Sequence, residues 1–140
     1  MDTTQLSGRE LALQLASNEL SSGNFYQTLA RRVGLRTVSQ DPERSDTLRD
    51  YLTEEIVPHL SKLGFDSQVI ENPKSDHPPL LISQRIEDPT LSTLLLYGHG
   101  DVTDGQEDKW TDGIAPWELT FVDGRVYGRG PADNKGQHSI

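Results

Sequence analysis

Apolar residues in the first part of the chain recur among polar ones at the spacing of helices. Residues 10–20 contain four leucines in a pattern that fits a short amphipathic helix better than a strand, and Ser-Ser-Gly at 21–23 is expected to stop it. Residues 25–33 fit a second short helix, for which Gly34 is a suitable end. The chain is therefore predicted to begin with two short helices.

A third helix has the strongest periodic signal. Ser45 or Asp46 can cap its start, and Gly64 is expected to stop it. Pro58 lies inside this stretch, so we expect a kink or a turn there. The apolar stripe of the helix consists of Leu48, Leu52, Ile56, Leu60 and Leu63.

The apolar pattern after Gly64 changes to that of strands. Residues 65–70 and 80–86 are each predicted to form a strand. Residues 91–97 are almost wholly apolar, which predicts a third strand in the centre of a sheet. Residues 117–128 predict a hairpin, because Asp123-Gly124 is a strong turn signal. We therefore expect an α/β fold with a mixed sheet flanked by helices.

Composition and charge narrow the classes of function. The 140 residues suffice for one domain, and no run of 18 apolar residues or leader-like N-terminus is present, so we expect a cytoplasmic location without a membrane partner. A net charge of −9 argues against a nucleic-acid partner, because phosphate binding needs clustered Lys and Arg. The chain has no cysteine, so a metal ion would have to be held by His, Asp and Glu.

Two segments in the last third of the chain carry the candidate chemistry. An apolar run breaks into Gly-His99-Gly-Asp101, which delivers an imidazole and a carboxylate at a strand end. Because one residue separates them, an extended backbone points both side chains to one face, where Asp101 can accept the second N–H of a metal-bound His99. Asp133 follows a glycine-rich turn that is predicted to open a helix, so a second carboxylate can converge on the same sheet edge.

Each segment also has a plainer interpretation when it is taken alone. His-x-Asp tripeptides are common by chance, and most are surface pairs. An aspartate at the position of Asp133 is typical of a helix N-cap. The joint occurrence of the two segments favours the metal site, since a loop with Trp110 and a hairpin ending in Tyr127-Gly-Arg-Gly connect them.

In this combination the sequence resembles a family of dinuclear zinc hydrolases. The family includes aminoacylase, acetylornithine deacetylase, succinyl-diaminopimelate desuccinylase and the carnosine-type dipeptidases. The resemblance covers about residues 45–140 and is strongest from Leu94 onward. It implies that His99 binds one zinc ion, that Asp101 orients His99, and that Asp133 bridges two zinc ions.

The resemblance has further implications and some departures. It implies a cis peptide bond between Asp133 and Asn134, and it implies two zinc ions as cofactor, with cobalt or manganese as substitutes. Gly100 stands where many members of the family have a larger residue between the His and the Asp. Trp117 stands where Phe is common in the family. The catalytic Glu-Glu pair and the later acidic and histidine ligands of the family have no counterpart in the 140 residues.

The other histidines and the nearby cations are expected to lie outside the site. His59 falls on a predicted helix, His77 in a proline-rich loop, and His138 five residues after Asp133, so each is interpreted as solvated or locally satisfied. Lys135 and Arg129 are interpreted as exposed charges.

We therefore expect the amino-terminal part of a metallohydrolase catalytic domain, with a helical segment at about 5–63 and a sheet and metal-site segment at about 64–140. The expected substrate is a small peptide or an N-acyl amino acid, whose amide bond is cleaved through a water activated by two metal ions. The chain alone is expected to be inactive. The family resemblance also implies that the full-length protein can form a homodimer. Two alternatives stay open, namely a non-catalytic α/β interaction module and a truncated product with an incomplete sheet.

Overall fold

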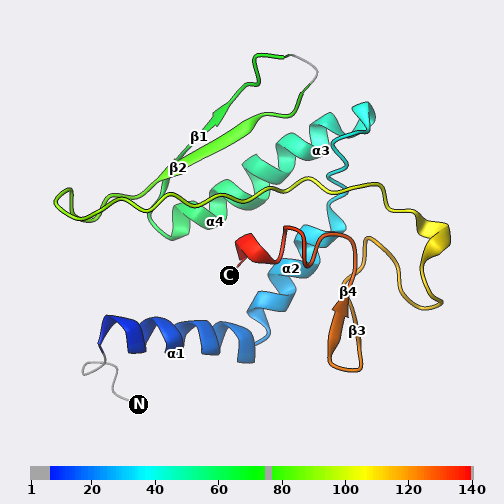
Figure 1. Cartoon of the computed structure of the whole chain (residues 1–140), viewed down its shortest axis with the longest axis horizontal. Helices are drawn as coiled ribbons and strands as arrows, with labels where there is room; N and C mark the ends of the chain where they lie inside the picture. Colours follow the sequence, from blue (N-terminus) through cyan, green and yellow to red (C-terminus); the bar gives the residue numbers. More distant parts are fainter. Residues whose placement is uncertain (1–6, 75–76, 140) are drawn as a thin grey trace.

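The computed structural model describes residues 7–74 and 77–139, which form helices, two small sheets and long connecting segments (Figure 1). The first helix, α1, spans Gly8–Ser21 and begins at a capping box in which Ser7 and Glu10 bond each other's backbone N–H. The second helix, α2, spans Asn24–Gly34. Both predicted helices are confirmed. No residue of α1 is buried, whereas α2 buries Leu29, Arg32 and Val33.

The predicted third helix is confirmed as three consecutive helical segments. It starts as α3, Ser45–Asp50, widens into a π-helical segment, Tyr51–Ile56, and ends as α4, Val57–Lys62. Pro58 lies just after the π-helical segment. Because proline has no N–H to donate, it cannot continue the α-helical bonding of the preceding turn, and the widened turn accommodates it. The π-helical segment carries Tyr51, of which only 2% is exposed.

The strands form two separate antiparallel pairs. The first joins β1, Asp66–Ile70, to β2, Leu80–Gln84, and the second joins β3, Thr120–Val122, to β4, Arg125–Tyr127. The predicted Asp123-Gly124 turn is confirmed, since both residues have positive φ angles of 49° and 74°. An isolated β-bridge between Val38 and Val102 is parallel, so the strand pairing includes both orientations. The predicted α/β fold class is confirmed as helices combined with small sheets, and in the described residues the strands form two antiparallel pairs.

The prediction of a central strand at residues 91–97 is wrong for the described part of the chain. This segment is extended but lies in no hydrogen-bonded strand, and it crosses the molecule as a long connection (Figure 1). Leu94, Leu95, Leu96 and Tyr97 are 79–92% exposed. Apolarity predicts a strand covered on both faces, but coverage depends on neighbouring strands, and the described residues supply none.

The core lies where α2 meets two other parts of the chain (Figure 1). One is the long helix formed by α3, the π-helical segment and α4, and the other is the C-terminal turn at residues 131–136 with the short helix that follows it. Its buried apolar side chains are Leu29, Val33, Val38, Leu48, Tyr51 and Val102. Short 3-10 helices complete the structure at Pro42–Arg44, Glu107–Lys109 and Gln137–Ser139. Among the described residues, no helix is both long and apolar enough to cross a bilayer.

Candidate metal centre

The extended segment at residues 91–97 leads to His99, and the backbone just after His99 is fixed by Thr37, which follows α2. The N–H of Val102 donates to the carbonyl of Thr37 at 2.9 Å, and the hydroxyl of Thr37 donates to the carbonyl of Gly100. Thr37 is fully buried, so this pair of bonds is shielded from water. The backbone on the C-terminal side of His99 is therefore held by two hydrogen bonds to Thr37.

The imidazole of His99 lies between two carboxylates. Its Nδ1 is 2.8 Å from Oδ1 of Asp101, and its Nε2 is 3.0 Å from Oδ1 of Asp133. The Asp133 side chain is 84% exposed and that of Asp101 is 43% exposed, so the carboxylate beside Nε2 is the more open to solvent. The sequence analysis predicted that these three residues converge, and the structure brings them together.

Asp101 is oriented by a second contact. Its Oδ2 accepts the hydroxyl of Ser39 at 3.1 Å, and Ser39 in turn accepts the amide of Gln40 at 2.8 Å. One oxygen of the Asp101 carboxylate thus faces His99 while the other is held by Ser39. A carboxylate on Nδ1 fixes the tautomer of a histidine and leaves Nε2 available to a metal ion.

Asp133 lies in a tight turn rather than at the start of an α-helix. The turn covers residues 131–136, and the next helical element is the short 3-10 helix Gln137–Ser139. The peptide bond between Asp133 and Asn134 is cis, as the family resemblance implied. At Gly130, φ is +92° and an added Cβ would lie 2.8 Å from Val102 Cγ1. Glycine is therefore needed there for the turn to pack against Val102.

Lys135 anchors the turn from inside the protein. Its Nζ donates to the carbonyls of Arg32 at 2.7 Å and Leu35 at 2.6 Å. The side chain is 0% exposed, and this burial lowers the pKa of Lys135 to about 7. The sequence-based interpretation of Lys135 as an exposed charge is therefore wrong, because its acceptors are backbone carbonyls about a hundred residues earlier in the chain.

Arg129 fixes the loop that borders the site. Its Nη2 donates to the carbonyl of Gly105 at 3.1 Å, and its guanidinium lies over the ring of Trp110. The indole N–H of Trp110 donates to the same carbonyl at 2.8 Å. Arg129 is half-buried rather than exposed, and it joins the loop after Asp101 to the turn that carries Asp133.

A cleft of about 470 Å³ contains the three predicted residues. Its lining consists of His99, Asp101, Val102 and Thr103 on one side and residues 128–133 on the other. The chemistry of this lining, one imidazole and two carboxylates, suits zinc and similar ions. The 3.0 Å between Nε2 of His99 and Oδ1 of Asp133 is also close to the roughly 3.3 Å that two ligands of one tetrahedral zinc ion keep.

The cleft nevertheless supplies an incomplete ligand set. Within residues 7–74 and 77–139, no group of three or more His, Asp or Glu side chains is arranged to hold a metal ion together. Asp101 is directed at Nδ1 of His99, on the opposite side of the ring from Asp133. Two side chains, those of His99 and Asp133, therefore face a common point.

The remaining histidines lie outside the cleft. His59 lies on α4, where burial lowers its pKa, and His77 lies in the loop between β1 and β2. His138 is locally satisfied, as predicted, but in a way that the sequence did not reveal, since its ring bonds Tyr51 and Asn134. The sequence feature that could have indicated this contact is the pair of glycines, Gly98 and Gly100, which leave room for the His138 and Tyr51 side chains.

No family model matches the chain. It is 48% identical over 131 residues to the Beta-Ala-His dipeptidase of Homo sapiens, a match that covers 84% of this chain and 25% of that protein. It is 34% identical over 124 residues to a Cys-Gly metallodipeptidase of Schizosaccharomyces pombe, with 80% and 25% covered. The crystal structure of human carnosine dipeptidase 1 superposes with a TM-score of 0.77 at 30% identity, over 89% of this chain and 28% of that one. The chain thus spans about a quarter of the length of the relatives it matches.

Proposed function

Because the chain is a homologue of the amino-terminal portion of metallodipeptidases and acetylornithine deacetylase, we propose that it forms part of the active site of a metal-dependent hydrolase. The proposed reaction is cleavage of the amide bond of a small peptide or an N-acyl amino acid. The observation that supports it most directly is the imidazole of His99 between the carboxylates of Asp101 and Asp133.

His99 and Asp133 are the proposed metal ligands. Zinc is the proposed ion, and cobalt or manganese can replace it, since nitrogen and oxygen ligands discriminate weakly among these ions. When bound, a pair of such ions polarises the scissile carbonyl and lowers the pKa of a water molecule. His99 and Asp133 would hold such ions, and Asp133 would offer two carboxylate oxygens, each able to serve as a ligand.

Asp101 has a different proposed role. It accepts the Nδ1 proton of His99, which keeps the ring in the tautomer whose Nε2 lone pair faces Asp133. The bond from Ser39 keeps the Asp101 carboxylate in place. Asp101 is therefore proposed to set the orientation and basicity of His99 without contacting the metal.

The chain alone is proposed to be inactive. A catalytic zinc ion usually has three protein ligands, and the described residues bring two side chains to a common point. The remaining ligands, and the glutamate that takes a proton from water, are proposed to belong to residues outside this chain. The substrate and any homodimer are likewise proposals about a longer protein, and a cytoplasmic location stays a prediction from the sequence.

These proposals predict a large difference between the chain alone and the native protein, meaning the polypeptide that carries these residues in its source cells. We expect the 140-residue chain to bind zinc at least about 100-fold more weakly than the native protein, since even the loss of an indirect contact costs 10–100-fold. We expect it to hydrolyse no member of a panel containing β-alanyl-histidine, Cys-Gly and N-acetylornithine. Zinc titration of both proteins and chromatographic assay of the panel test this.

Two controls accompany the comparison. His99→Ala in the 140-residue chain shows whether its residual zinc binding occurs at the proposed site. The native protein should hydrolyse at least one member of the panel, and the preferred member separates a dipeptidase from a deacylase. A native protein that cleaves none of them would contradict the proposed function.

A second candidate function is a non-catalytic interaction module. The exposed apolar residues Leu94 to Tyr97 favour it, because an unpaired extended segment can add a strand from a partner. Metal separates the two candidates: an interaction module should bind its partner equally well with and without a chelator, whereas a hydrolase should lose activity.

A further inference from the structure

A chain of hydrogen bonds runs from the long helix to the backbone of His99. The Tyr51 hydroxyl is 2.6 Å from Nε2 of His138, and Nδ1 of His138 is 3.1 Å from Oδ1 of Asn134. The same Oδ1 of Asn134 accepts the main-chain N–H of His99 at 3.0 Å. Tyr51, His138 and Asn134 are thereby connected to the backbone of His99 in the candidate metal centre.

The donor and acceptor at each step follow from the chemistry of the groups. An amide oxygen can only accept, so Nδ1 of His138 must carry the proton that it shares with Asn134. Nε2 of a neutral His138 then has a free lone pair, and the Tyr51 hydroxyl donates to it. Burial lowers the pKa of His138 to about 4 and raises the pKa of Tyr51, so both groups are neutral near pH 7.

The orientation of the Asn134 amide is consistent with this order. Its Nδ2 donates to Oε1 of Gln137, which can only accept at that atom. Its Oδ1 receives two N–H groups, one from the His138 ring and one from the His99 backbone. Asn134 directly follows Asp133, so a single amide links the turn that carries one proposed ligand to the backbone of the other.

The glycines on either side of His99 let the two rings approach. A Cβ at Gly98 would lie 2.9 Å from Cβ of His138, and a Cβ at Gly100 would collide with the Tyr51 ring. Real Cβ atoms do not occur at such contacts, so both positions require glycine while the rings stay where they are. The small residue between His99 and Asp101, a departure from the family resemblance, thus has a physical cause in Tyr51.

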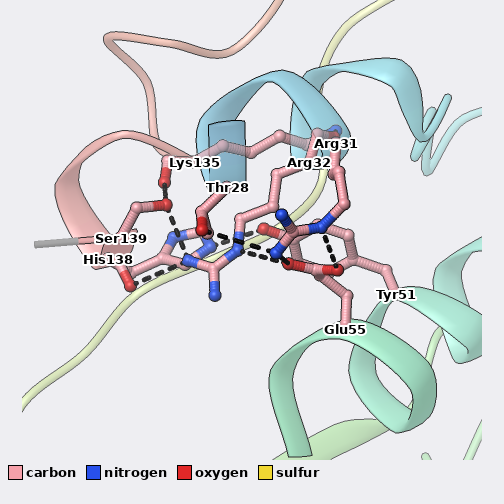
Figure 2. Close-up of polar contacts among 8 residues, drawn as sticks. All are labelled: Thr28, Arg31, Arg32, Tyr51, Glu55, Lys135, His138 and Ser139. Atoms are coloured by element: carbon pink, nitrogen blue, oxygen red, sulfur yellow. Dashed lines mark hydrogen bonds and ion pairs between the residues drawn. The ribbon is translucent and has the colours of Figure 1, made fainter. Parts of the chain in front are cut away.

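Both rings are themselves held in place. Figure 2 shows Tyr51, His138, Ser139 and Lys135 gathered around Arg32 of α2. Arg32 donates to the carbonyl of His138 at 3.3 Å and to the hydroxyl of Ser139 at 2.6 Å. The ammonium of Lys135 lies 5.2 Å from the centroid of the Tyr51 ring. A ring that is fixed by its surroundings can hold the amide in one position.

We propose that His138 is a positioning residue for the metal site, because its ring holds the Asn134 amide that ties the backbone of His99 to the turn carrying Asp133. This proposal rests on the proposed function, in which His99 and Asp133 bind the metal ion. His138 itself does not contact substrate or metal. Outer contacts of this kind typically change metal affinity by 10–100-fold.

The test compares variants of the native protein after its metal has been removed. His138→Leu removes the donor to Asn134, whereas His138→Asn places an amide N–H close to the position of Nδ1. We expect His138→Leu to weaken zinc binding by about 10–100-fold in a competition titration and to alter the visible absorption spectrum of the cobalt-substituted protein. His138→Asn should recover most of the affinity. The melting temperature of the metal-free protein is recorded for each variant as a control on folding.

The outcomes separate the possible roles. If His138 has only a structural role, the His138→Leu substitution should lower the melting temperature of the metal-free protein but leave its zinc affinity and cobalt spectrum as in the parent. That result would overturn the proposal. If His138→Leu does not fold, Tyr51→Phe removes only the hydroxyl that orients the ring and should still weaken zinc binding severalfold; unchanged affinity in that variant also overturns it.

The same titration keeps this proposal distinct from the proposed function. His99→Ala should abolish high-affinity zinc binding if the proposed function is right. If His99→Ala binds zinc as tightly as the parent, the metal site has been assigned wrongly and the proposed function fails. If His99→Ala loses binding but His138→Leu keeps it, only the positioning role of His138 fails.

Discussion

Replacing Asp133 with asparagine in the native protein is expected to lower kcat/KM for amide hydrolysis by at least about 10³-fold. Metal ions contribute several kcal/mol to stabilising charge in such transition states, and each 1.4 kcal/mol is tenfold in rate. An asparagine keeps the size of the side chain but supplies a neutral amide, which is a weaker ligand than a carboxylate. Bound zinc per polypeptide should fall together with the rate.

The same change elsewhere in the chain provides a matched control. Asp123 lies at the exposed tip of the hairpin between β3 and β4 with φ of 49°, a conformation in which asparagine is readily accepted. Asp123→Asn should therefore keep full activity and zinc content. An Asp133→Asn protein that retained more than about a tenth of the parental kcat/KM would contradict the assignment of Asp133 as a metal ligand, because that loss corresponds to only 1.4 kcal/mol.

Replacing Arg32 with leucine is expected to lower the free energy of unfolding by about 3–5 kcal/mol. Arg32 is 1% exposed, and its Nε is 3.2 Å from Oε1 of Glu55 on the long helix. The same guanidinium donates to Ser139 and to the carbonyl of His138. Its removal leaves the Glu55 carboxylate, only 14% exposed, without its buried partner, and the C-terminal turn without its anchor on α2.

The neighbouring arginine is the control for this prediction. Arg31 contacts Glu55 beside Arg32 (Figure 2), with its Nη2 3.3 Å from the same oxygen of Glu55. The Arg31 side chain, however, is 57% exposed. Ion pairs of exposed side chains contribute little, so Arg31→Leu should cost less than about 1 kcal/mol. Urea unfolding of the native protein and both variants, followed by far-UV circular dichroism, measures the difference. Equal costs for Arg31→Leu and Arg32→Leu would contradict the role given to burial.

Local patterns carried most of the secondary structure. The spacing of apolar residues predicted the helices because it repeats about once per helical turn, although α1 buries none of its leucines. Asp123-Gly124 predicted the hairpin because few residues adopt positive φ. The cis peptide bond after Asp133 was implied by the family resemblance alone. The helices and the hairpin, by contrast, depend on neighbouring residues in the sequence, which is why the sequence was sufficient for them.

The errors concern features that depend on distant residues. Lys135 was interpreted as exposed, yet its ammonium bonds the carbonyls of Arg32 and Leu35 inside the protein. The apolar run at residues 91–97 was predicted to be a central strand, yet pairing requires neighbours that the described residues do not provide. The identity of one residue cannot reveal such contacts, since the residues that it contacts lie far away in the sequence.

The candidate site shows the same division. The spacing of His99 and Asp101 predicted that one side chain faces the other, because residues two apart in an extended chain share a face. The approach of Asp133 to His99 was expected from the glycine-rich turn before Asp133, and the family resemblance implied that both bind metal. The supporting contacts of Tyr51 and Asn134 were missed, since they arise only when the long helix and the C-terminal turn meet at the glycines beside His99.

The measurement that tests the central claim most directly is the rate at which the native protein hydrolyses its preferred member of the panel before and after its metal is removed. The protein is isolated with an antibody against this chain, dialysed against a chelator, assayed, and assayed again after zinc is restored. We expect the rate without metal to fall below about 1% of the starting rate, because the metal ions supply several kcal/mol of catalysis, and to recover with zinc. A rate that is unaffected by the chelator would contradict the assignment of this chain to a metal-dependent active site.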